Sequence, residues 1–337
     1  MFKKYNKCIF CKSKNFKIEK IKKSKINFYV QSIISDLNLK SKDFKKIRSY
    51  KCQNCFILQN NPWFSEEVSQ KIYGNIYGQH NRSWSNILNF VNKGIKPNHG
   101  DLYEFLQKRI KIKNYAEFKA PFMGLMLNFF SEEYKEDTNF LKKYFNLIIK
   151  YLNSRQVVDQ PKKIKKLSIS KGTKIFKKIS NLSKKNCKKK IVNKYLFLKN
   201  SDLSWGQNDN YKSVNSISLA SEFINDLNLK QLNIKERKFK FDLFGIFHTL
   251  DHTFEPKKIL DYALNVSKYV IIYCHNDKEL NRQHLFSFTK EFVKFLNKNK
   301  IYTFELNDLI NKDFKSPELY FICSRKKKNI EYLKQFK

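Results

Sequence analysis

Short runs rich in β-branched and aromatic residues recur through the C-terminal part of the chain. They are KYLFLKN, FDLFGIFHTL, KYVIIYCH, IYTFELN and LYFICSR, at residues 194–200, 241–250, 268–275, 301–307 and 319–325. Segments with a helical pattern separate several of these runs. Such alternation favours a doubly wound sheet whose strands are mostly parallel, with room for an antiparallel strand at the C-terminal end. We therefore predict an α/β fold.

The segment ahead of this region has a different pattern. Residues 62–113 read as helical, and Ser65 precedes EEVSQKIYGNIYG as an N-cap residue. YAEFKAPFMGLMLNFF, at residues 115–130, is apolar but interrupted by Pro121 and Gly124, which predicts a short strand, a turn and the start of a helix. A Lys-rich stretch at about 155–192 is poorly suited to a core, and we interpret it as an exposed insertion.

Four of the seven cysteines form two C-x-x-C pairs near the N-terminus, Cys8 with Cys11 and Cys52 with Cys55. Each pair lets two thiolates from one tight turn reach the same ion, and two pairs complete a tetrahedral site. The sequence therefore predicts a zinc ribbon whose Zn²⁺ is enclosed and structural. The remaining cysteines are isolated and are interpreted as ordinary residues: Cys187, Cys274 and Cys323.

These patterns divide the chain into three parts. We predict a zinc-ribbon module at residues 1–61, a helical connector at 62–113, and an α/β domain at 114–337 that carries the Lys-rich insertion. No run of apolar residues reaches the length of a signal peptide or a transmembrane helix. We therefore expect a cytoplasmic protein with no membrane insertion.

The formal net charge of +38 is extreme for 337 residues. A positive charge of this size is typical of proteins that bind nucleic acid or an anionic surface. The lysines are nevertheless spread along the whole chain, together with abundant Asn, Ile and Phe, which favours compositional drift. A small anionic substrate, such as one that bears phosphate, is compatible with both interpretations.

Residues 241–276, FDLFGIFHTLDHTFEPKKILDYALNVSKYVIIYCHN, resemble a stretch of the class I S-adenosylmethionine-dependent methyltransferases. In that family a strand beginning Phe-Asp and ending near Leu-Glu-His precedes a helix and a further strand. The next segment, RQHLFSFTKEFVKFLNKNKI, is also similar to the family's pattern. Because a cysteine-paired zinc module comes first, the chain looks most like sugar C-methyltransferases. The resemblance implies a Rossmann-like methyltransferase fold and S-adenosylmethionine as cofactor.

The resemblance also implies where this cofactor would bind. The family has a Gly-rich turn after its first strand, introduced by an acidic residue, and here Glu117 and Gly124 stand in those places. Three residues depart from the pattern, because they are poor fits for a loop that a ligand approaches closely: Lys119, Pro121 and Met123. A second acidic residue that holds the cofactor ribose corresponds to Asp202.

Asp251 and His252 follow a buried strand, at the edge where open α/β sheets bind ligands. We predict that both line the cofactor site, although a helix cap and a solvent-facing histidine would fit the same pattern. His284 matches the general base of sugar C-methyltransferases, with Gln283 where those enzymes have Glu.

Aromatic and polar residues elsewhere are candidates for contact with substrate. The resemblance places Tyr77 and His80 in the substrate pocket. Trp205, in SWGQND, could stack on an adenine or a sugar ring, and it could equally be a core residue beside a turn.

Three functional hypotheses follow. The first is methyl transfer from S-adenosylmethionine to a small, sugar-nucleotide-like or surface-polysaccharide-pathway acceptor. The second is an RNA methyltransferase, which the zinc module and the positive charge favour. The sequence has no obvious Asn- or Asp-Pro catalytic tetrapeptide, which disfavours this hypothesis. The third is a catalytically inactive, methyltransferase-like binding or scaffold protein, favoured by the departures in the cofactor loop.

Overall fold

The computed structural model describes residues 2–19, 38, 40, 42, 46–71, 105–106, 108–118, 193–198, 230–233, 240–247, 250–275, 285–307 and 318–336. Across these ranges, no helix combines the length and the apolar composition required to cross a membrane. The described elements form a seven-stranded sheet, a four-stranded sheet and a two-stranded pair, with a few helices packed on them.

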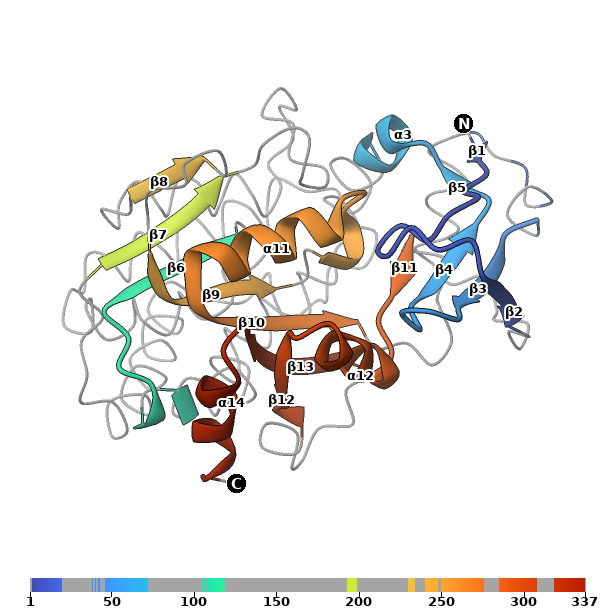
Figure 1. Ribbon diagram of the computed structural model, residues 1–337. Coiled ribbons are helices and arrows are strands. Elements are labelled where there is room, and N and C mark those ends of the chain that lie inside the picture. Colours follow the sequence, from blue (N-terminus) through green and yellow to red (C-terminus); the bar gives the residue numbers. More distant parts are fainter. Residues whose placement is uncertain are drawn as a thin grey trace, which may run out of the picture.

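The seven-stranded sheet is mixed. In spatial order β12-β13-β10-β9-β6-β7-β8, the five strands from β10 to β8 are parallel, whereas β13 is antiparallel to both β10 and β12 (Figure 1). The strands are β6 (Asn114–Phe118), β7 (Asn193–Leu198), β8 (Lys230–Asn233), β9 (Phe241–Phe247), β10 (Ser267–His275), β12 (Tyr302–Glu305) and β13 (Glu318–Ser324). Each of the five β-rich runs predicted from the sequence contains residues of one strand of this sheet, and the antiparallel strand lies near the C-terminus as predicted.

The direction in which the chain crosses this sheet reverses between β6 and β9. From β6 the chain proceeds outward to β7 and then β8, and afterwards continues at β9 on the other side of β6. Because β6 and β9 are parallel neighbours, their carboxyl ends meet at the same edge of the sheet.

Residues 241–275 form the strand–helix–strand unit that the sequence predicts. After β9, a short 3₁₀ turn at Leu250–His252 leads to α11 (Pro256–Val266), and β10 follows in parallel with β9. Glu255 is the N-cap residue of α11 and Pro256 occupies its first turn, where a missing amide costs no hydrogen bond. The apolar side of α11 is buried through Ile259, Leu260, Ala263 and Leu264.

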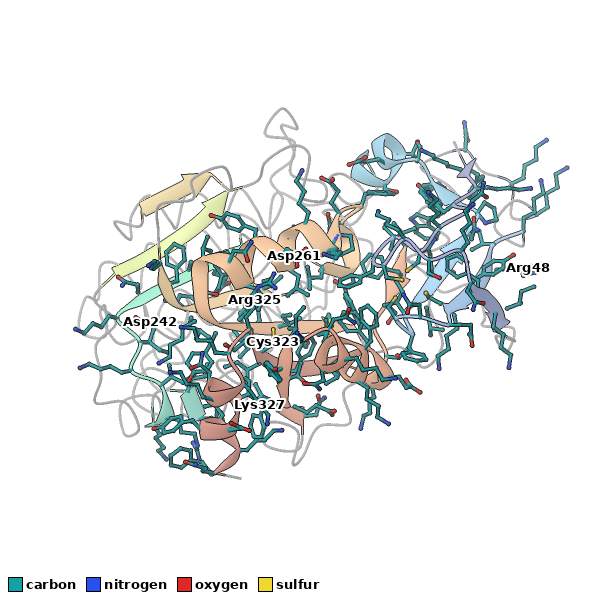
Figure 2. The ribbon with its side chains drawn as sticks, in the orientation of Figure 1. Arg48, Asp242, Asp261, Cys323, Arg325 and Lys327 are labelled. Atoms are coloured by element: carbon teal, nitrogen blue, oxygen red, sulfur yellow. The ribbon has the colours of Figure 1, made fainter. Side chains whose placement is uncertain are left out.

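The side chain of Asp242, at the start of β9, joins two strands of the large sheet. Its Oδ2 accepts hydrogen bonds from the backbone N–H groups of Lys113 and Asn114, both at 2.9 Å. The carboxylate therefore ties the start of β9 to the start of β6, at the end of the strands opposite to their carboxyl edge. Figure 2 shows Asp242 beside β6, far from Arg48 in the small sheet.

The smaller sheet has the order β11-β4-β3-β2, and all its pairings are antiparallel. Three of its strands come from the N-terminal region, namely β2 (Phe16–Glu19), β3 (Arg48–Cys52) and β4 (Leu58–Asn61). The fourth, β11 (Phe286–Ser287), comes from the C-terminal part of the chain, as the orange arrow among blue ones shows in Figure 1.

Residues around position 64 differ in part from the helical pattern predicted for 62–113. β5 (Trp63–Phe64) is a short strand, because it pairs with β1 (Phe2–Lys3), and α3 (Glu66–Lys71) follows it. Ser65 caps α3 as predicted, since its Oγ accepts from the N–H of Val68 at 3.5 Å.

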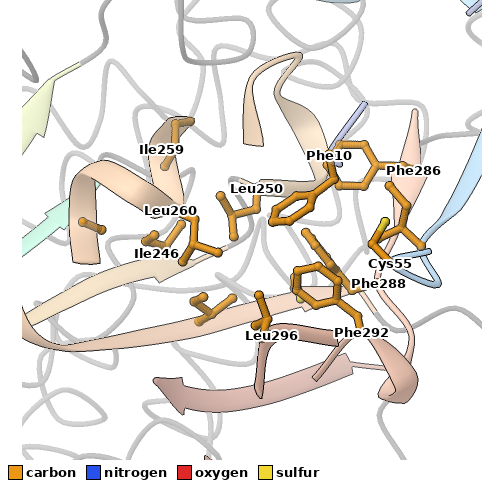
Figure 3. Packing of buried hydrophobic residues seen from close by; sticks show 14 of the residues in the cluster. Phe10, Cys55, Ile246, Leu250, Ile259, Leu260, Phe286, Phe288, Phe292 and Leu296 are labelled. Carbon is orange, nitrogen blue, oxygen red and sulfur yellow. The ribbon is translucent and has the colours of Figure 1, made fainter. Parts of the chain in front are cut away.

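One hydrophobic cluster joins the two sheets. Figure 3 shows Phe10, from the N-terminal region, beside Phe288 and Phe292, the latter in α12 (Lys290–Lys298). The ring centroids of Phe10 and Phe292 lie 4.9 Å apart in an edge-to-face arrangement. The same cluster includes Ile246, Leu250 and Leu260 from the central unit of the large sheet. A last helix, α14 (Lys327–Lys334), follows β13 and contacts β12 and β13.

Candidate functional site

The four cysteines of the two C-x-x-C pairs converge in space. Their Sγ atoms all lie within 4.8 Å of one another, with 3.5 Å between Cys8 and Cys55 and 3.5 Å between Cys11 and Cys52. Four sulfurs bound to zinc at about 2.3 Å in a tetrahedron would lie about 3.8 Å apart. The separations are also far too long for disulfides, and the cysteines are free. The cluster can therefore hold a metal ion such as zinc, as the spacing predicts.

Two similar turns present these thiols. In the first, the N–H of Lys12 donates to the carbonyl of Cys8 at 3.0 Å, and in the second the N–H of Phe56 donates to the carbonyl of Cys52 at 2.9 Å. Lys12 and Phe56 both have positive φ values, 61° and 64°. Left-handed backbone is unfavourable for these residue types by about 1–2 kcal/mol, so the repeated conformation indicates that the surroundings impose it.

The long insert between the pairs does not separate the cysteines. β2 and β3 form an antiparallel pair in which Phe16 lies opposite Cys52 and Glu19 opposite Ser49. The connection between these strands therefore leaves and returns at the end of the pair away from the cysteines. This register brings the two turns together, although Cys11 and Cys52 are 41 positions apart.

The cysteine cluster is enclosed, and the pKa values of its thiols depend on one another: those of Cys8 and Cys55 are raised and those of Cys11 and Cys52 are lowered. Cys8, Cys52 and Cys55 are fully buried and Cys11 is partly buried. Contact with the thiols of Cys11 and Cys52 raises the pKa of Cys8, and burial adds to this. Contact with the same two thiols, then with that of Cys8, raises the pKa of Cys55. Thiolates this close repel one another, so a bound cation is needed to hold them together in the charged form.

Hydrogen bonds link the cysteine turns to the C-terminal part of the chain. The N–H of Asn60 donates to the carbonyl of Leu285 at 2.8 Å, immediately before β11. Thr289, the N-cap residue of α12, donates its hydroxyl to the carbonyl of Phe56 at 2.9 Å. The conformation of the second turn is thus fixed partly by residues more than 200 positions away.

The second candidate site is the carboxyl edge of the large sheet. Glu117, the penultimate residue of β6, is completely buried there and its Oε2 accepts a hydrogen bond from the hydroxyl of Tyr115. Burial, followed by the negative charge of Glu117 and this hydrogen bond, raises the pKa of Tyr115 well above its usual value. The tyrosine therefore stays protonated and remains a hydrogen-bond donor to the carboxylate.

Two residues beside Glu117, Tyr115 and Gly245, were not identified from the sequence. Gly245 lies opposite Glu117 in the register of β9 and β6. A Cβ atom at Gly245 would overlap the Tyr115 hydroxyl and would lie 2.6 Å from a ring carbon of Phe247. Two signals in the sequence could have identified these residues. A glycine inside a strand pattern indicates that another group approaches the backbone closely, and side chains two positions apart in a strand lie on the same face.

Asp251 and His252 lie in the 3₁₀ turn that follows β9. The carboxylate of Asp251 is completely buried. The position of this turn, after the carboxyl end of a central parallel strand, is the one predicted from the sequence. Asp251 does not cap α11, because Glu255 holds that position.

Several predicted site residues lie outside the described part of the chain. They are Tyr77, His80, Gly124, Asp202, Trp205 and His284, together with the Lys-rich stretch at 155–192. Their predicted roles stay predictions. Of the isolated cysteines, Cys274 and Cys323 are buried in β10 and β13, as expected for ordinary core residues, and burial raises the pKa of Cys323.

Comparison with known proteins yields no match, either among models of protein families or among curated proteins.

Proposed function

We propose that the chain is an S-adenosylmethionine-dependent methyltransferase of the class I type, acting on a small anionic acceptor such as a sugar nucleotide. The observation that carries this proposal is the order of the large sheet. Numbered along the chain, its strands lie in the order 3-2-1-4-5-7-6, and the first five positions match the order of nucleotide-binding, doubly wound sheets. Such sheets bind ligands at the carboxyl edge where the order reverses, here between β6 and β9.

The residues at this edge fit a cofactor with hydroxyl and ammonium groups. Glu117 is the penultimate residue of β6 and Asp251 follows β9, so a buried carboxylate lies near the carboxyl end of both strands that flank the reversal. Carboxylate oxygens accept hydrogen bonds from such donors. The resemblance of residues 241–276 to the methyltransferase family adds independent support from the sequence.

The bound cofactor would supply an electrophilic methyl group on a sulfonium. The protein's part is then to align a nucleophile with that methyl group, and to remove a proton where the acceptor atom is carbon. His284 is the residue proposed for that proton transfer, and Tyr77, His80 and Trp205 are proposed to hold the acceptor. Asp202 and Gly124 are proposed to contact the cofactor beside Glu117.

We also infer that the cysteine cluster binds one zinc ion with a structural role. Its support is the chemistry of the ligands, since the groups that converge there within the described part of the chain are four thiols. Tetrathiolate sites are typically four-coordinate and leave no open position for substrate.

Calorimetric titration with S-adenosylmethionine and S-adenosylhomocysteine tests the proposed activity. We expect both to bind the wild type, and Glu117→Gln to weaken binding about tenfold, or about 1.4 kcal/mol. Glu305→Gln is the matched control, because Glu305 is an exposed carboxylate on the distant edge strand β12, and it should bind like the wild type.

Other outcomes of the titration select the alternatives. Well-folded protein that binds neither compound would overturn the proposal and favour the inactive scaffold. Methylation of RNA, with binding that weakens steeply as salt is added, would identify an RNA methyltransferase instead.

A further inference from the structure

The carboxylate of Glu117 lies in a confined position on one face of the large sheet, beside strand β9. Tyr115 and Glu117 are two residues apart on β6, so both side chains project from the same face of the sheet. Both are completely buried. On the neighbouring strand β9, the residue in register with Glu117 is Gly245, and its missing side chain leaves space at this point of the face.

The Tyr115 hydroxyl occupies that space. A Cβ atom at Gly245 would overlap the hydroxyl and would lie 3.3 Å from Cγ of Glu117. The position of the hydroxyl is therefore set by β9 as well as by β6. From there it donates to Oε2 of Glu117, and this bond fixes the orientation of the carboxylate at the carboxyl edge of the sheet.

We propose that Tyr115 and Gly245 are positioning residues for a ligand-binding carboxylate at Glu117, with Tyr115 orienting it and Gly245 providing the space. This inference rests on the proposed function for the identity of the ligand, a nucleoside with hydroxyl or ammonium donors. A carboxylate that is held before the ligand arrives loses little freedom on binding. Hydrogen bonding by Tyr115 also stabilises the charged form, which is the form that accepts from such donors.

The test compares Tyr115→Phe with Tyr269→Phe in the full-length, metal-containing protein. Tyr269 is a matched control because it is a buried tyrosine in β10 whose hydroxyl donates to a backbone carbonyl, that of Asn329, at 3.4 Å. With S-adenosylhomocysteine as the probe, we expect about tenfold weaker binding for Tyr115→Phe and less than a twofold change for Tyr269→Phe. The pH at which binding is half lost on acidification should rise only in Tyr115→Phe. Equal effects of the two variants would overturn the proposal.

A second measurement needs no ligand and separates this inference from the proposed function. During an acid titration, the infrared spectrum of Glu117→Gln is subtracted from that of the wild type. The difference gives the band of the Glu117 carboxyl group. We expect Tyr115→Phe to move the protonation midpoint of that band to higher pH, and an unchanged midpoint would overturn the inference even if the cofactor binds. A shifted midpoint in protein that does not bind S-adenosylhomocysteine would retain the positioning role and refute only the proposed cofactor.

If Tyr115→Phe does not fold, proton NMR of the wild type decides. A low-field, slowly exchanging hydroxyl resonance that moves upfield in Glu117→Gln supports the bond. Its absence from the wild type would contradict it.

Discussion

Replacing Gly245 with alanine should destabilise the fold because of the hydroxyl of Tyr115. The new Cβ would overlap that hydroxyl and lie 2.6 Å from the ring of Phe247, in a strand held by hydrogen bonds to parallel neighbours on both sides. Overpacking of a core typically costs about 1–3 kcal/mol. Restricting the unfolded chain by a Gly→Ala change returns about 0.4–1 kcal/mol. From the middle of each range, we expect a net loss of about 1.3 kcal/mol.

The contribution of the hydroxyl can be isolated with a double-mutant cycle. In the Tyr115→Phe background the overlap with oxygen is absent, whereas the close contacts with Phe247 and Glu117 remain, so Gly245→Ala should cost less by about 0.5–1 kcal/mol. The assay is urea unfolding of the four proteins with metal present, followed by circular dichroism. A loss that is equal in both backgrounds within about 0.3 kcal/mol would refute the reasoning. Repeating the cycle with Tyr269→Phe should give additive effects, because that hydroxyl faces Asn329.

Three further predictions concern metal binding, the hydrogen bonds of Asp242 with Asp261 as its control, and the hydrogen bond from Thr289 to Phe56. Metal analysis should give about one zinc per chain, lost in Cys55→Ala but kept in Cys274→Ala; less than a tenth of that amount in wild type never exposed to chelator would contradict the site. Asp242→Ala should lower the free energy of unfolding by about 2 kcal/mol, since two backbone donors lose a charged acceptor. Asp261→Ala, which removes exposed ion pairs with Lys257 and Arg325, should cost less than about 1 kcal/mol; Figure 2 labels Asp261 and Arg325, and a loss equal to that of Asp242→Ala would refute the distinction. Thr289→Val should cost about 1 kcal/mol in urea unfolding through the lost bond to Phe56, and no change would show that this link is not stabilising.

The sequence predicts the central unit of the large sheet well because its signals are local. Alternation of β-rich runs with an amphipathic helix identifies β9, α11 and β10, and Glu255-Pro256 marks where the helix begins. The convergence of the cysteines is predicted for a similar reason, since two C-x-x-C turns have few other uses in one chain. Each signal is local, although the two cysteine pairs that converge are separated in the sequence, with 41 positions between Cys11 and Cys52.

Features that depend on distant pairing were not predicted. β11 has only two residues, and its place beside β4 depends on a register between Phe286 and Gln59 that no local pattern encodes. The role of Gly245 likewise depends on which strand lies next to β9 and on its register with Glu117. Because β6 is that neighbour, a side chain at position 245 would overlap the hydroxyl of Tyr115, and this explains the glycine.

Strand β11 joins the small sheet, which carries the cysteine cluster, to the C-terminal part of the chain. A boundary near residue 61 is predicted from the sequence, yet the small sheet is completed by β11, and Phe10 packs on Phe288 and Phe292 across that boundary. The second cysteine turn and the strand that follows it therefore both contact the segment that begins at Leu285, since Phe56 accepts from Thr289 and Asn60 of β4 donates to the carbonyl of Leu285. His284 directly precedes this segment in the sequence. A metal ion bound by the four cysteines would therefore affect the proposed chemistry without touching substrate, because β4, which follows the second turn, contacts the chain immediately after the proposed base.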